Sequence, residues 1–137
     1  MKIIGFNLSK ILAEKKEKVE GKIQINQNIN IKEATKDKIP ISQNEILSVR
    51  FVFTVDYSED FAKLEFEGNV LLLPEKEELK VFLKSWKDKK IPDDFKTPLF
   101  NFIMSRCNIK ALNLEEELSL PHHISMPRIN PGNPENQ

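Results

Sequence analysis

The stretch from Lys22 to Lys32, KIQINQNINIK, alternates between apolar and polar side chains along almost its whole length. Its isoleucines fall on one side of an extended backbone, and only Gln27 interrupts that apolar side. A period of two residues is typical of a β-strand with one buried face and one exposed face. This pattern constrains the fold more than any other feature, because a one-sided strand needs both a sheet and a second layer over its apolar face.

Three other segments repeat the pattern, so the sequence predicts four one-sided strands, at residues 3–13, 21–33, 46–57 and 61–73. In the first strand the apolar residues predicted to lie in step are Ile4, Phe6, Leu8 and Leu12. The short polar link from Ser58 to Asp60 predicts an antiparallel hairpin between the last two strands. Gly68 interrupts the apolar face of the fourth strand and indicates a bulge or a close backbone approach.

The period changes from two residues to a helical one after Pro74. The next apolar residues follow the spacing of one helix face and predict a short helix that ends near Trp86: Leu79, Phe82, Leu83 and Trp86. A second helix is predicted to begin at Thr97-Pro98 and to run to Leu118. The predicted fold is therefore α+β, a four-stranded antiparallel sheet with two C-terminal helices packed on one face.

The domain organisation follows from length and from the distribution of proline. At 137 residues the chain is predicted to form a single domain, which we assign to residues 1–129. Residues 130–137, NPGNPENQ, are polar and contain two prolines, and they predict a disordered tail.

Composition narrows the classes of function. Lysine and arginine together number 21, and so do aspartate and glutamate, so no overall field attracts nucleic acid or an anionic membrane. The single cysteine excludes an internal disulfide framework and a cysteine-cluster metal site. No apolar run is long enough for a signal peptide or a membrane span, so we expect a soluble, cytoplasmic protein.

Few residues have the arrangement that catalysis or metal binding requires. His122 and His123 are adjacent and therefore point apart, which favours a plain loop pair over joint metal ligands. Cys107 lies on the apolar stripe of the second helix, where a small buried thiol is the usual role. Glu65 and Glu67 share a strand face, yet solvated charges opposed by lysines explain them better than paired-carboxylate chemistry. The run Glu115–Glu117 is interpreted as an exposed, solvated helix face, and we predict no enzyme activity, no metal and no cofactor.

The basic segment KSWKDKK, Lys84 to Lys90, contains an aromatic residue and could form a small nucleic-acid patch. Trp86 belongs to the apolar helix stripe, however, and the C-terminal end of a helix favours lysines in any case. We therefore predict no nucleic-acid partner.

Apolar residues at unusual places are the remaining candidates for function. The fourth strand ends in three consecutive leucines, and several large apolar residues fall in predicted connections. They either cap edges of the core or line a groove for a partner chain, since contiguous exposed apolar area marks interaction sites. The candidate client-binding residues are Phe61, Leu71, Leu73, Trp86, Ile91, Pro92 and Phe95.

Several segments resemble the SecB family of protein-export chaperones. The segment TPLFNFIMSR, Thr97 to Arg106, resembles the start of that family's long helix, and FEGNVLLL, Phe66 to Leu73, resembles its last strand. The segment from Ala111 to Ile129 is similar to the proline-containing segment that follows the long helix. The family is strongly acidic, whereas this chain has no net charge.

The resemblance implies a holdase with a role in protein transport, which binds unfolded polypeptide clients in apolar grooves without ATP. It also implies a cytoplasmic homo-oligomer, a dimer or a tetramer, paired through sheet edges. The amide-rich side of the Lys22–Lys32 strand would then suit a subunit interface, although an ordinary exposed face explains it equally well. The competing class is a dedicated interaction or assembly protein with one specific folded partner.

Overall fold

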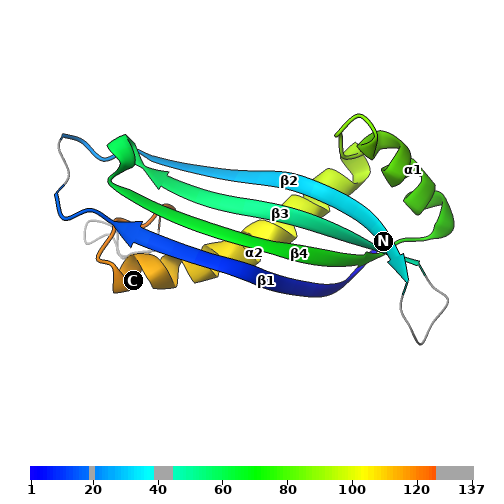
Figure 1. The fold of residues 1–137 in the computed structure, drawn as a ribbon, viewed down its shortest axis with the longest axis horizontal. Coiled ribbons are helices and arrows are strands. Elements are labelled where there is room, and N and C mark those ends of the chain that lie inside the picture. The colour runs from blue at the N-terminus through cyan, green and yellow to red at the C-terminus, as the bar shows by residue number, and fades with distance from the viewer. Residues whose placement is uncertain (19–20, 39–44, 126–137) are drawn as a thin grey trace, which may run out of the picture.

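The computed structural model of the chain describes residues 1–18, 21–38 and 45–125 (Figure 1). The predicted tail, residues 130–137, lies outside them. Four strands form one antiparallel sheet in the order β1-β4-β3-β2: β1 (Lys2–Lys15), β2 (Ile25–Lys38), β3 (Glu45–Tyr57) and β4 (Ala62–Leu73). β2, β3 and β4 follow one another as neighbours, and β1 lies beside β4, which is Greek-key order.

Two helices complete the fold, α1 (Lys76–Trp86) and α2 (Asp93–Glu117). α2 runs diagonally across one face of the sheet, and α1 lies beyond the sheet end at which β1 begins (Figure 1). The face covered by α2 is called the core face, and the opposite one the outer face. The predicted α+β architecture, a four-stranded antiparallel sheet followed by two helices, is confirmed.

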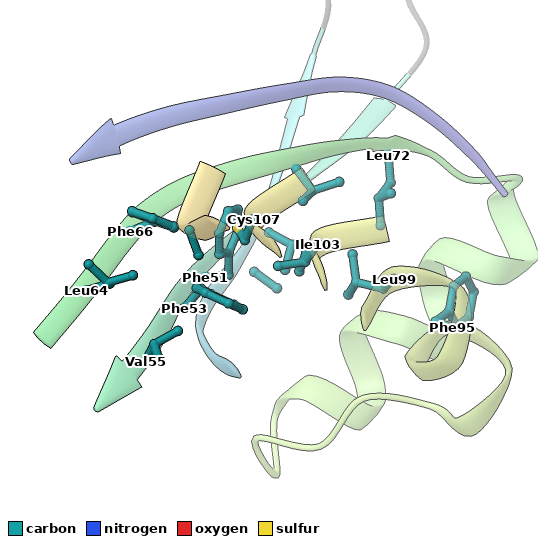
Figure 2. Close-up of a cluster of buried hydrophobic side chains, with 14 of the residues drawn as sticks. Phe51, Phe53, Val55, Leu64, Phe66, Leu72, Phe95, Leu99, Ile103 and Cys107 are labelled. Atoms are coloured by element: carbon teal, nitrogen blue, oxygen red, sulfur yellow. The ribbon is translucent and has the colours of Figure 1, made fainter. Parts of the chain in front are cut away.

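The core lies between the sheet and α2 (Figure 2). Alternate residues of β3 and β4 enter it, and the rings of Phe53 and Phe66 stack with their centroids 5.7 Å apart. The buried residues of α2 recur every four positions, so one stripe faces the sheet: Phe95, Leu99, Ile103, Cys107, Ala111 and Glu115.

The predicted phase of β1 is wrong at both of its ends. Register shifts fall between Ile3 and Gly5 and between Leu8 and Lys10, so two residues are inserted relative to β4. Each inserted residue reverses the alternation of the residues that follow it. Ile4 is consequently displaced from the pattern and exposed, and Leu12 pairs with Glu65 on the outer face. The residues of β1 that pack against the core are Ile3, Phe6, Leu8 and Ala13.

Gly68 explains the second shift, and its predicted role is confirmed. It pairs with Leu8 at the bulge, and a Cβ atom there would come within 2.3 Å of the Asn7 carbonyl oxygen. No side chain other than hydrogen allows the two backbones to approach so closely.

β2 begins at Ile25 and extends to Lys38, later and further than predicted. Gln27, which interrupts the apolar side of the strand, does lie on the core face, opposite Val55. Its side-chain N–H donates to Oδ1 of Asn108 on α2 (3.3 Å), so the polar group is paired.

α1 begins as expected, with a capping box in which the side chains of Glu75 and Glu78 each accept the other residue's backbone N–H. α2, in contrast, begins at Asp93, four residues before the predicted Thr97, and carries Pro98 inside its second turn. Proline costs one backbone hydrogen bond there. The additional turn is stabilised because it places Phe95 in edge-to-face contact with Phe82 of α1 (5.4 Å).

Candidate functional site

A pocket of about 800 Å³ lies at the end of the sheet, where β4 passes into α1. Its apolar wall is formed by Leu73, Pro74, Leu79 and Leu83. Strand alternation sends Leu72 into the core and leaves Leu71 and Leu73 half-buried on the outer face. Leu79 and Leu83 are one helical turn apart and therefore present one face of α1 to the same pocket.

Charged side chains surround this apolar wall. Lys2 of β1, Lys36 of β2 and two lysines of α1, Lys76 and Lys80, line the pocket together with Glu45 and Glu75. Both carboxylates are engaged: Glu45 lies 3.6 Å from the Lys36 ammonium, and Glu75 caps α1. The pocket combines an apolar wall with an excess of positive charge, four lysines against two glutamates.

The structure brings only one of the candidate client-binding residues, Leu73, into this pocket. Leu71 lies two residues earlier on the same face and covers Gly5 of β1, where an added Cβ would meet its Cδ1 at 3.0 Å. Trp86, Ile91 and Pro92 are half-buried; Trp86, at the end of α1, and Ile91, in the connection between the helices, pack against the core. The Lys89 ammonium lies 4.9 Å from the centre of the Trp86 ring.

Two candidates, Phe61 and Phe95, are core residues of the free chain, with 9% and 5% of their surface exposed. Phe95 lies in the first turn of α2 and not in a connection. Phe61 lies at the opposite end of β4 from Leu73. A client could contact either ring only after the chain around it moved.

Sequence reasoning missed the other pocket residues, although the signal for two of them was present. Leu79 and Leu83 lie on one predicted helix face, but nothing in the local sequence shows that this face meets the end of β4. The lysines come from three elements that are far apart in the sequence. Only the folded chain brings them together.

A second cluster of polar side chains is buried near the C-terminal end of α2. Glu115 has no exposed surface, so its prediction as a solvated residue is wrong. Its carboxylate accepts hydrogen bonds from the Tyr57 hydroxyl (2.6 Å), the His123 backbone N–H (3.2 Å) and His123 Nδ1 (2.9 Å). Because a carboxylate only accepts, Nδ1 of His123 is the donor in this hydrogen bond. Glu115 continues the four-residue stripe of α2, which was the signal available in the sequence.

His123 extends this network. Its side chain is fully buried, and Nε2 lies 2.7 Å from the side-chain amide of Asn108, whose Oδ1 accepts from Gln27. Burial, followed by the hydrogen bond and charge of Glu115, raises the pKa of Tyr57 well above its ordinary value. The network joins β2, β3 and α2 to the segment after α2. We interpret the network as structural, because it holds the segment after α2 against the sheet, and we call it the buried clasp.

His123 is therefore not part of a plain loop pair as predicted, and the remaining candidates for chemistry are His122 and Cys107. His122 points away from His123 and contacts Glu116 (2.6 Å), and within the described residues no three His, Cys, Asp or Glu side chains form a metal cluster. Cys107 is buried, and burial raises the pKa of its thiol to about 12. A thiol with that pKa stays protonated at neutral pH and is a poor nucleophile.

Glu65 and Glu67 belong to a network of surface ion pairs. The Lys10 ammonium lies 2.6 Å from the Glu65 carboxylate and Lys63 lies 3.5 Å from it, while Arg50 contacts Glu67 at 3.4 Å. The hydrogen bond from Lys10 lowers the pKa of Glu65 below its ordinary value. These contacts agree with the interpretation of the two residues as solvated charges. None of the helices in the described part of the chain is long and apolar enough to cross a membrane.

These features define the chain as an α+β protein with one sheet, a long covering helix and a half-apolar pocket at the sheet end. Among solved structures it is similar to the Mycobacterium tuberculosis Rv1957 SecB-like chaperone in complex with a ChAD peptide from the Rv1956 HigA1 antitoxin. The TM-score is 0.56 at 17% identity, over 95% of this chain and 91% of that chain. At this identity the similarity shows a SecB-like fold. No family model and no curated protein matches the sequence.

Proposed function

We propose that this protein is an ATP-independent chaperone of the holdase type, which binds non-native polypeptide segments. One observation carries the proposal: the SecB-like fold extends over 95% of the chain, and the similar structure contains a SecB-like chaperone with a bound peptide. The apolar wall at Leu73, Leu79 and Leu83 supports it, because apolar side chains of a client gain about 25 cal/mol per Å² on leaving water.

The proposed client surface begins at the pocket and includes the half-buried residues near it. Leu71 and Leu73 present their side chains on the outer face. Trp86 ends α1, and Ile91 and Pro92 lie in the adjoining connection between the helices. Phe95 lies in the core, where its ring packs against Phe82 of α1 and so joins the two helices on either side of that connection. Phe61 would take part only in a separate contact at the other end of the sheet.

Suppression of aggregation tests the proposal. We expect the protein, without ATP, to reduce light scattering by several unrelated proteins during their thermal or chemical unfolding. Leu73→Ser should weaken this effect, whereas Val52→Ser should not, because Val52 is also half-buried on the outer face but does not line the pocket. Full aggregation of every substrate in the presence of a folded protein contradicts the proposal.

The alternative is a dedicated interaction protein with one specific folded partner. The same fold supports it, because the similar SecB-like chaperone is in complex with one peptide from one antitoxin. A single tight partner in a pull-down, together with no suppression of aggregation, favours this second function.

We also propose a cytoplasmic homo-oligomer. β1 and β2 are the two edges of the sheet, and each is 14 residues long. Such edges commonly pair with another chain, and Ile11 on β1 is half exposed. We expect light scattering on a size-exclusion column to give a mass of at least a dimer, and Ile11→Lys to lower it. A wild-type mass of 15.9 kDa at micromolar concentration contradicts this proposal.

A further inference from the structure

The pocket at the sheet end is lined by charged side chains in addition to its apolar wall. We propose that it selects polypeptide segments in which a carboxylate side chain lies beside a large apolar one. This inference rests on the proposed function, because it specifies the chemistry of the polypeptide that the protein binds.

The balance of charge at the pocket is the first support for this selection. Four lysines against two glutamates leave an excess of two positive charges. Over the whole chain the 21 acidic residues cancel the 21 basic ones, so this excess belongs to the pocket and not to the protein as a whole. A local field of one sign attracts ligand groups of the opposite sign and disfavours like charges.

Part of this positive charge is also available to a ligand. Among the described residues, Lys2 and Lys76 have no carboxylate within 4.0 Å, and Lys80 makes only an exposed contact with Glu77 at 3.9 Å. Both glutamates of the pocket already have partners. A carboxylate that entered the pocket would therefore meet ammonium groups without displacing an existing close ion pair at Lys2 or Lys76.

The position and size of the pocket favour a polypeptide as its occupant. Lys2 lies on β1 and Lys36 on β2, so the pocket adjoins both edge strands of the sheet. The oligomer proposed above is tested at β1, and the edge of β2 can offer its backbone N–H and C=O groups to a bound chain. A volume of about 800 Å³ suits a few side chains of such a segment and not a folded domain. A small amphiphile, in contrast, cannot use the strand edges.

Fluorescence anisotropy with three labelled, unstructured peptides tests this proposal on the full-length protein. The peptides share one leucine- and phenylalanine-containing core and differ only in the flanking residues, which are glutamate, serine or lysine. We expect the glutamate peptide to bind about tenfold more tightly than the lysine peptide, the size expected for two or three exposed ion pairs. The difference should shrink between about 0.05 and about 0.5 M NaCl, because salt screens exposed charges.

Paired variants assign the preference to the pocket. Lys2→Glu with Lys76→Glu should abolish or reverse it, while circular dichroism stays unchanged, because both side chains are exposed. Lys18→Glu with Lys22→Glu is the matched control: it changes the total charge equally, at the connection between β1 and β2 at the other end of the sheet (Figure 1). The control should retain the wild-type preference.

The outcomes separate this inference from the proposed function. Equal affinity for the three peptides, or equal loss of preference in both double variants, overturns charge selection while peptide binding stands. If a fatty acid such as decanoate displaces the peptides, and the protein shows no tenfold preference among the three peptides, the choice of a polypeptide as the occupant is overturned. Suppression of aggregation without any peptide binding overturns the assignment of the pocket as the peptide-binding site, while the proposed chaperone activity stands. Failure of both assays overturns both proposals.

Discussion

Replacing Phe53 or Phe66 with alanine is expected to lower the free energy of unfolding by about 3–5 kcal/mol, the range for a large buried aromatic residue. Both side chains are fully buried, and their rings stack against each other between the sheet and α2 (Figure 2). The structure has few ways to fill the resulting cavity, because the rings belong to the two central strands of the sheet. Urea denaturation at a fixed protein concentration measures the effect.

Phe100→Ala is the matched control for these two variants. Phe100 lies on α2 between the buried Leu99 and Ile103, but it is only half-buried, with the Lys96 ammonium 6.0 Å from its ring centre. Its removal opens no enclosed cavity, so the midpoint should move much less. A midpoint that barely moves for Phe53→Ala and Phe66→Ala would mean that the assignment of the strand faces is wrong.

Glu115→Ala is expected to destabilise the protein by several kcal/mol, because each buried donor left without an acceptor costs about 1–3 kcal/mol. The substitution leaves the N–H groups of His123 without their acceptor in a site that water does not reach. It also removes one of the two acceptors of the Tyr57 hydroxyl and leaves only the Pro121 carbonyl (2.6 Å). Hydrogen exchange should show the segment Leu120–His123 becoming less protected than the strands.

The neighbouring residue provides the control for this variant. Glu116 is mostly exposed, and its contact with His122 is a surface pair of little energetic value. Glu116→Ala should leave both the denaturation midpoint and the exchange of Leu120–His123 close to wild type. Equal midpoints for the two alanine variants would show that Glu115 is not held in the buried clasp.

Features that depend on a single uninterrupted element could be predicted from the sequence. The alternation of apolar and polar residues along β3 and β4 shows which side chains avoid water, and Phe53 and Phe66, which both lie on the apolar side, are fully buried. The polar link at Ser58–Asp60 was enough to predict the hairpin, because its two strands are adjacent in the chain. The start of α1 after Pro74 is equally local.

The candidate site was predictable only in part, for the same reason. Leu73 could be identified because strand alternation turns its side chain to the face of β4 that Leu72 does not occupy, and it does line the pocket. Phe95 was predicted in a connection because Thr97-Pro98 is a good local helix start, but its contact with Phe82 favours an earlier one. Tertiary packing overrides a local helix-start preference of this kind when an earlier start buries a large side chain.

Features that depend on partners distant in the sequence could be established only from the folded chain. The phase of β1 depends on Gly68, which accepts the close approach of Asn7 and so permits the bulge opposite it. The burial of Glu115 depends on donors from β3 and from the segment after α2. A carboxylate leaves water only where such donors replace its hydration, and their positions are set by the packing of the whole chain.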